Sequence, residues 1–162
     1  MKTIGIIPAR MGASRFLGKP LALMLGMPMV GHCFHRTRLA LGLDAVCVAT
    51  CDEAIAEYVQ SIGGKAVMTS STHKRATTRT AEALEIIERE TGEKIDVVVM
   101  VQGDEPLIPP EMIGETLKHL LEELHLRRDG KIVKDWKLEV GSDSSAARSM
   151  ATREGVGKVR HL

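Results

Sequence analysis

The sequence predicts a three-layer α/β/α fold built around a mostly parallel sheet. Short apolar segments alternate with amphipathic ones along residues 1–126, the order expected of consecutive β-α-β units. Residues 96–101 are almost entirely apolar, as in a parallel strand that helices cover on both faces. Aromatic residues make up only 2% of the chain, so the core between these layers must be aliphatic.

Each expected element follows from a local pattern. Pro8 ends the first strand, because proline cannot donate to a sheet ladder. Pro28 opens one helix, since proline suits a first helical turn, and Asp52 is a good N-cap for the next. The expected strands are 3–8, 44–50, 65–68 and 96–101, with an extended piece at 21–25; the expected helices are 28–41, 52–62, one from Thr78 or Thr80 to about 92, and one from 109–110 to about 124.

The loop after the first strand carries three cations and no acidic side chain. Arg10, Arg15 and Lys19 are separated by glycine, alanine and serine, which let a backbone approach a ligand closely. Such a loop suits a polyanion, and triphosphate is the obvious candidate. The Walker and dinucleotide glycine patterns are both absent, so side-chain charge would bind the phosphates. A solvated turn is the alternative that these residues alone leave open.

Three short motifs stand in order along the chain. Ile-Ile-Pro-Ala-Arg at 6–10 continues to Gly-Lys-Pro-Leu at 18–21, residues 73–82 follow, and Val-Gln-Gly-Asp-Glu-Pro occupies 101–106. Together they resemble the CMP-sugar synthetase family over residues 1 to about 120. The resemblance is greatest to the 3-deoxy-manno-octulosonate cytidylyltransferases (CMP-Kdo synthetases), and it implies a Rossmann-like nucleotidyltransferase fold.

The resemblance also implies an activity and a set of site residues. The expected enzyme is a Mg²⁺-dependent cytidylyltransferase that transfers CMP from CTP to a 2-keto sugar acid such as 3-deoxy-manno-octulosonate and releases pyrophosphate, as in lipopolysaccharide biosynthesis. Arg10, Lys19 and Asp104 match catalytic positions, with Asp104 as the metal ligand. Arg79 and Gln102 match positions that bind the acceptor. The nucleotide-binding positions are Pro8, Ala9, Arg10, Ser14, Arg15, Lys19, His73 and Arg75.

The chemistry of the residues supports some of these roles and leaves others open. Asp104 follows an apolar strand, where a carboxylate needs a cation or hydrogen bonds, and Mg²⁺ takes such oxygen ligands. The alternative is a turn aspartate that caps its own backbone. The planar fork of Arg79 suits a carboxylate. His73 either donates to a ligand or is solvated, and Glu105 is either a hydrogen-bond acceptor near the metal or exposed.

The chain departs from the family in two respects. The family has a glycine and an acidic residue shortly before the arginine at 79, where this chain has Ala76 and Thr78, positions that bear on base and sugar selectivity. Residues 127–162 do not resemble the second half of the longer family members. We therefore expect a nucleotide-binding domain at 1–126 and an atypical tail at 127–162, with a hairpin or edge strand at 132–140 followed by disorder.

Composition excludes several classes of function. A net charge of +1, from 22 basic and 21 acidic residues, and the few aromatics argue against nucleic-acid binding. No apolar run approaches transmembrane length and no signal peptide opens the chain. Cys33, Cys47 and Cys51 fit the reduced thiols of a cytosolic protein. We expect a cytoplasmic protein whose partners are CTP and a sugar acid, with no membrane.

Two alternative hypotheses stay open beside the enzyme. The chain could be a non-catalytic remnant that kept the nucleotide site but lost the acceptor site, which predicts nucleotide binding without turnover. A third hypothesis is that the shortened sheet exposes an apolar face and pairs with a second copy, as a homodimer or higher oligomer, or with another partner.

Overall fold

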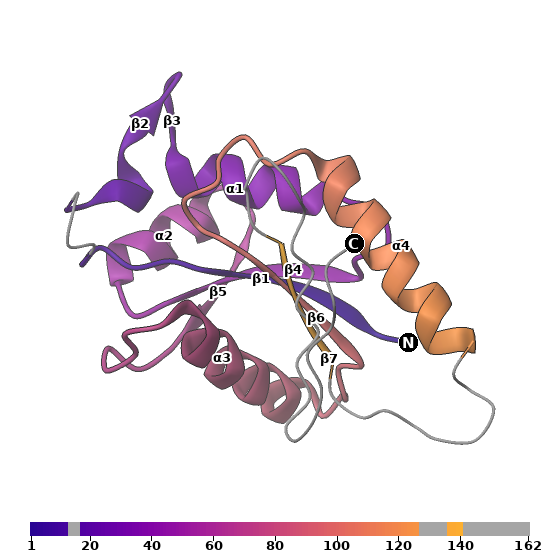
Figure 1. The fold of residues 1–162 in the computed structure, drawn as a ribbon. Helices are drawn as coiled ribbons and strands as arrows, with labels where there is room; N and C mark the ends of the chain where they lie inside the picture. Colours follow the sequence, from indigo (N-terminus) through magenta and orange to yellow (C-terminus); the bar gives the residue numbers. More distant parts are fainter. Residues whose placement is uncertain (13–16, 127–135, 141–162) are drawn as a thin grey trace.

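The central layer of the structure is a parallel sheet. The computed structural model describes residues 1–12, 17–126 and 136–140. Its long strands are β1 (Thr3–Pro8), β4 (Ala45–Thr50), β5 (Lys65–Met68), β6 (Val97–Val101) and β7 (Trp136–Val140). They lie in the order β5-β4-β1-β6-β7, and every neighbouring pair is parallel (Figure 1). The predicted parallel sheet is confirmed, and it places the first predicted strand beside the strand predicted at 96–101.

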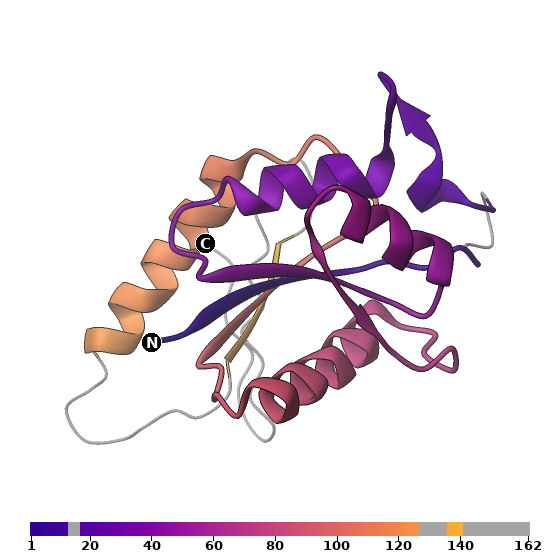
Figure 2. The ribbon, with the colours of Figure 1, turned by 180° about the vertical axis from the view of Figure 1, so that it is seen from behind.

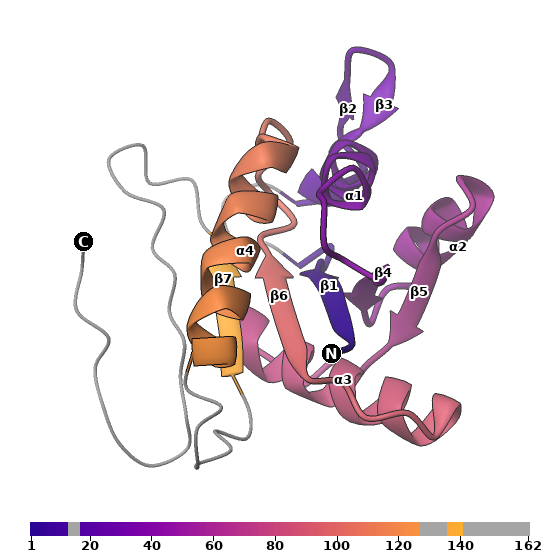
Figure 3. The same cartoon turned by 90° about the vertical axis from the view of Figure 1, so that its right-hand side faces the viewer.

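Helices cover both faces of this sheet. One layer contains α1 (Met29–Arg38), α2 (Glu53–Ser61) and α4 (Pro110–Leu126), and the opposite layer contains α3 (Ala76–Thr91) (Figures 2 and 3). Alternate strand residues point into the two layers, with Ile7 and Val48 in the first core cluster and Ile6 and Cys47 in the second. The predicted three-layer α/β/α fold is therefore confirmed, and its core is aliphatic as expected.

Several helix boundaries differ from the prediction by a few residues, and two of them are explained by local hydrogen bonds. Helix α1 ends at Arg38, three residues early, because its backbone bonds tighten to a 3₁₀-type contact from the Ala40 amide to the Thr37 carbonyl at 3.1 Å. Helix α3 begins at Ala76, before either predicted threonine, and Arg75 is its N-cap residue. Thr78 lies within the first turn, where its hydroxyl donates to the Arg75 carbonyl at 3.0 Å.

The extended piece expected at 21–25 is more elaborate than predicted. A 3₁₀ helix (Lys19–Leu21) leads into an antiparallel hairpin of β2 (Leu23–Met24) and β3 (Met27–Pro28). The hairpin projects from the body of the molecule next to α1 (Figure 1). In the tail, the described part is β7, which forms an edge strand, one of the two alternatives predicted there. The expected disorder of 141–162 concerns residues outside the described part.

Candidate functional site

Two of the sequence motifs meet where β1 and β6 end. The strands are paired in register, with Ile6 opposite Met100, so the segments that follow them leave the same edge of the sheet. Gly103 packs against the end of β1, where a Cβ atom on it would lie 2.6 Å from the Pro8 carbonyl oxygen. Because that oxygen belongs to the backbone, only glycine allows this approach. The crevice lies beyond the carboxyl ends of the strands, as expected for ligands of parallel sheets.

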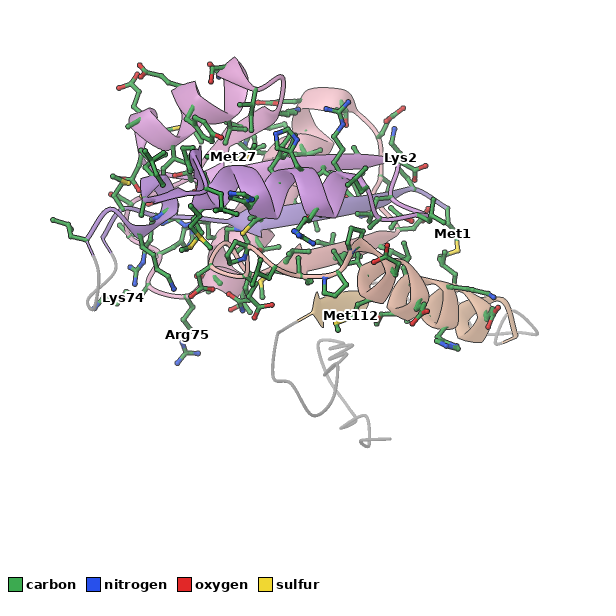
Figure 4. The ribbon with its side chains drawn as sticks, turned by 90° about the horizontal axis from the view of Figure 1, so that it is seen from above. Met1, Lys2, Met27, Lys74, Arg75 and Met112 are labelled. Atoms are coloured by element: carbon green, nitrogen blue, oxygen red, sulfur yellow. The ribbon has the colours of Figure 1, made fainter. Side chains whose placement is uncertain are left out.

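A pocket of about 290 Å³ opens at this edge. Its walls come from residues 8–10 and 19–20 after β1, from 73–76 and Arg79 around the start of α3, and from 102–104 after β6. Figure 4 shows Lys74 and Arg75 at this end of the molecule, with the Arg75 side chain projecting away from the ribbon. The described lining residues contain one carboxylate, Asp104, and five cationic side chains, Arg10, Lys19, Lys74, Arg75 and Arg79. With a net charge of only +1 on the whole chain, this positive charge is local and suits a polyanion.

A larger hollow lies elsewhere on the molecule. It measures about 980 Å³ and lies between the turn at 39–42 and α4. Leucine and glutamate side chains dominate its lining, with Lys118 as its single cation among the described residues. Because the residues of the sequence motifs line the smaller pocket and not this hollow, we place the functional site in the smaller pocket.

Lys19 and Asp104 join the two motifs directly. The Lys19 Nζ donates to Asp104 Oδ2 at 2.9 Å, and the side chains are 34% and 56% exposed. The carboxylate therefore pairs with a cation of the other motif instead of capping its own backbone, which was the alternative for Asp104. Glu105 is half-buried, so the exposed alternative for that residue is wrong.

Asp104 fits a magnesium ion that arrives with a triphosphate. Mg²⁺ commonly takes one or two carboxylates and completes its shell with phosphate oxygens and water. Asp104 offers one exposed carboxylate among cations that would face the phosphates. Among the residues that the structure describes, no group of three or more His, Cys, Asp or Glu side chains could hold a metal by itself. A single carboxylate among cations suits a metal whose remaining ligands come from phosphate oxygens and water.

The base of the basic loop is closed by contacts that the sequence did not indicate. The Gly18 amide donates to the Met11 carbonyl at 3.1 Å, and Gly18 has a φ of +76°, which favours glycine. The Met11 amide donates to Asp52 Oδ2 at 2.8 Å. Asp52 is the N-cap residue of α2, as predicted, but its side chain makes no capping bond there. Its place beyond the end of β4, the strand next to β1, is the signal that could have identified it.

His73 braces the loop before α3. Its Nδ1 lies 3.0 Å from Thr78 Oγ1 and its Nε2 lies 2.5 Å from Glu82 Oε2. The same glutamate oxygen accepts the Ser70 amide at 2.8 Å. That amide, followed by His73, lowers the pKa of Glu82. His73 is half-buried with both ring nitrogens engaged, so the solvated alternative is wrong; a role in nucleotide binding stays a prediction.

Arg79 is a buried guanidinium in the pocket wall. It is 2% exposed, and it donates to Thr69 Oγ1 at 2.5 Å and to Cys51 Sγ at 3.4 Å. Its charge also contributes to the lowered pKa of Glu82, after the Ser70 amide and His73. In the described part of the chain, Arg79 makes no ion pair with a carboxylate. A buried cation with two uncharged partners is a strong candidate for binding an anionic ligand.

Most of the predicted site residues line one pocket. These residues are Pro8, Ala9, Arg10, Lys19, His73, Arg75, Arg79, Gln102 and Asp104. Ser14 and Arg15 lie outside the described residues. Each predicted role stays a prediction, but the residues come from three separate segments that the fold brings together.

Comparisons with known proteins identify the family of the chain. The sequence profile named Cytidylyltransferase matches residues 4–148. The chain belongs to the cytidylyltransferase family. Within this family it is 49% identical over 119 residues to the mitochondrial 3-deoxy-manno-octulosonate cytidylyltransferase of Arabidopsis thaliana, covering 74% of this chain and 40% of the relative. The Geobacter metallireducens 3-deoxy-manno-octulosonate cytidylyltransferase is 46% identical over 127 residues, covering 78% and 48%.

Solved cytidylyltransferase structures show the same fold. The structure of CMP:2-keto-3-deoxy-manno-octonic acid synthetase complexed with CTP matches with a TM-score of 0.67 and 36% identity, over 76% of this chain and 48% of that one. The structure of 4-diphosphocytidyl-2C-methyl-D-erythritol synthase matches over 96% and 71% of the two chains, with a TM-score of 0.55; at 16% identity it shows likeness of fold alone. The chain spans about half the length of the curated relatives it matches. Within the described residues, none of the helices is both long and apolar enough to span a bilayer.

Proposed function

We propose that this cytidylyltransferase-family chain binds CTP with Mg²⁺ in the pocket and transfers CMP to a 2-keto sugar acid such as 3-deoxy-manno-octulosonate. The observation that carries the proposal is the convergence of five cations and one carboxylate where β1 and β6 end. The printed names of the relatives supply the base and the acceptor class.

The residues after the two strands would bind the nucleotide. Arg10 and Lys19 lie at either end of the closed loop and present charge to the triphosphate. Asp104 would hold the Mg²⁺, which when bound neutralises phosphate charge and polarises the α-phosphate. The Lys19 ammonium has three N–H donors and uses one of them on Asp104, so it can also donate to a phosphate oxygen.

The buried guanidinium would orient the acceptor. Arg79 can pair with the carboxylate of a sugar acid through two parallel hydrogen bonds, and Gln102 lies in the same pocket as a donor to hydroxyl or carbonyl groups. An acceptor hydroxyl oxygen then attacks the α-phosphorus and forms a new P–O bond. The P–O bond to the β-phosphate breaks, pyrophosphate leaves, and water takes the hydroxyl proton. Holding both reactants in this orientation is the main contribution of the chain.

A second candidate function is a nucleotide-binding module without transfer activity. The described pocket contains five cationic side chains that could face a triphosphate. The residues predicted to bind the acceptor are only two, Arg79 and Gln102. The two candidates agree on CTP binding and differ in turnover.

Titration calorimetry with Mg·CTP, and with Mg·ATP in parallel, tests the proposal. We expect CTP to bind and ATP to bind much more weakly, followed by pyrophosphate release when the sugar acid is added. Lys19→Ala should weaken CTP binding about tenfold, as expected for loss of a charged hydrogen bond. Lys65→Ala is the matched control, because Lys65 also makes one ion pair, at 3.4 Å to Glu90, at the far edge of the sheet.

The outcomes separate the two candidates. Binding of CTP without pyrophosphate release would support the nucleotide-binding module. The proposed site would be wrong if neither nucleotide bound, or if both lysine variants behaved alike. The expected homodimer is a separate prediction, which light scattering of the parent chain tests.

A further inference from the structure

A single carboxylate oxygen lies at the base of the basic loop. Asp52 Oδ2 accepts the Met11 amide at 2.8 Å. The next carbonyl group, that of Met11, accepts the Gly18 amide at 3.1 Å. These two bonds close the loop at its base, between the two pocket cations Arg10 and Lys19.

The same oxygen is itself held in place. The Cys51 thiol donates to Asp52 Oδ2 at 3.6 Å, and the sulfur accepts a hydrogen bond from Arg79 at 3.4 Å. The Asp52 amide donates to the Thr50 hydroxyl at 3.1 Å, which fixes the backbone that carries the carboxylate. A continuous series of contacts therefore runs from the buried guanidinium through the thiol and the carboxylate to the loop.

A carboxylate is an unexpected group at this position. It adds a negative charge next to a loop that would bind phosphates, which opposes the binding of a polyanion. Asp52 is the N-cap residue of α2, but its side chain makes no capping bond to that helix. Its observed contacts are those of an acceptor that fixes a backbone amide.

We propose that Asp52 is the positioning residue of the triphosphate loop: it fixes the Met11 peptide so that Arg10 and Lys19 converge on the pocket. The inference rests on the proposed function for the identity of the ligand, but the contact itself is a property of the free chain. If geometry is the reason for this residue, an uncharged acceptor of the same shape replaces it. Asp52→Asn then keeps the loop in place and Asp52→Ala does not.

The chain contains a matched control at the other end of β1. Asp44 Oδ2 accepts the Thr3 amide at 2.7 Å, so it also holds a backbone amide from a neighbouring segment. Asp44 lies just before β4, at the amino ends of the strands, whereas the pocket lies at their carboxyl ends. Asp44→Ala removes the same kind of contact without touching the loop.

The experiment measures the affinity for Mg·CTP by calorimetry in four proteins: the parent, Asp52→Ala, Asp52→Asn and Asp44→Ala. We expect Asp52→Ala to bind about tenfold more weakly, the loss that corresponds to one hydrogen bond. Asp52→Asn and Asp44→Ala should stay within about threefold of the parent. The proposal is overturned if Asp52→Ala binds as the parent does, or if Asp52→Asn is as weak as Asp52→Ala.

Hydrogen exchange of the Met11 amide in the absence of nucleotide is the second measurement. We expect exchange to be at least about tenfold faster in Asp52→Ala and near the parent rate in Asp52→Asn and Asp44→Ala. A parent chain that binds no nucleotide would refute the proposed function, and the exchange rates would still decide the role of Asp52. Equal Met11 exchange in the parent and Asp52→Ala would overturn the positioning role whatever the chain binds.

Discussion

Replacing Gly103 by alanine should disturb the site and the fold together. The added Cβ would lie 2.6 Å from the Pro8 carbonyl oxygen, and contacts of this kind essentially never fall below 3.0 Å, so the ends of β1 and β6 must separate by at least 0.4 Å. The obstructing atom belongs to the backbone of a strand paired on both sides and cannot rotate away. Overpacking of this kind costs about 1–3 kcal/mol of unfolding free energy.

Thermal unfolding and Mg·CTP titration measure the two effects of Gly103→Ala. We expect the Tm to fall by several degrees, as about 1–3 kcal/mol implies for a domain of this size. Affinity for Mg·CTP should fall too, because the separation moves the Asp104 segment relative to the loop after Pro8. Gly12→Ala is the matched control for stability, since a Cβ there meets nothing within 4 Å. The reasoning is refuted if the two variants unfold at the same temperature.

Three further predictions concern titratable groups. The pKa of Glu82 is lowered in the folded chain from its ordinary value of 4.5. Its ionised form therefore stabilises the fold at pH values above 4.5, and this stabilisation is lost as the pH falls through the lowered pKa. Urea unfolding should show Glu82→Gln to be less stable than the parent at neutral pH and equal to it in acid; a constant difference would contradict this. Burial raises the pKa of Cys33 and Cys47 to about 12, whereas Cys51 is only half-buried. Iodoacetamide should therefore label Cys51 first. Equal labelling of the three cysteines in peptide mass mapping would contradict this prediction. In EDTA, Asp104→Asn should bind CTP about fivefold more tightly than the parent, because the substitution removes a repulsion of about 1 kcal/mol between the carboxylate and the phosphates. Adding Mg²⁺ should increase the CTP affinity of this variant only slightly. Calorimetry that showed the same increase as in the parent would count against the metal assignment.

The sequence predicts the layers of this fold well because its strands are indicated both by their bounding residues and by their apolar composition. The observed β1 has the predicted bounds, and β4 and β6 each begin one residue later than predicted. Runs of apolar residues without alternation indicated burial on both faces, and β1 and β6 are indeed buried throughout. Their adjacency, which brings the two motifs into one pocket, comes from the observed strand order and is not indicated by either motif.

The contacts that support the site could not be predicted in the same way. An aspartate before a helix has the same sequence pattern whether it caps that helix or accepts an amide from another loop, and only the strand order puts Asp52 beside Met11. The pairing of His73 with Glu82 has no short sequence signature, because nine positions and the start of α3 separate the two residues. Glu82 lies in the second turn of α3 and its side chain reaches the preceding loop.

The contact between Lys19 and Asp104 explains why the pocket should prefer a metal–triphosphate to a free triphosphate. Both side chains are at least one-third exposed, so their ion pair contributes only about 0–1 kcal/mol and a ligand can displace it easily. A free triphosphate that took Lys19 would leave the Asp104 carboxylate facing phosphate oxygens, an unfavourable contact between like charges. A divalent cation carried by the nucleotide turns this repulsion into a shared set of oxygen ligands. We therefore expect the one exposed carboxylate among the five cations of the described lining to favour a metal-bound triphosphate, whereas the cations alone would accept any polyanion.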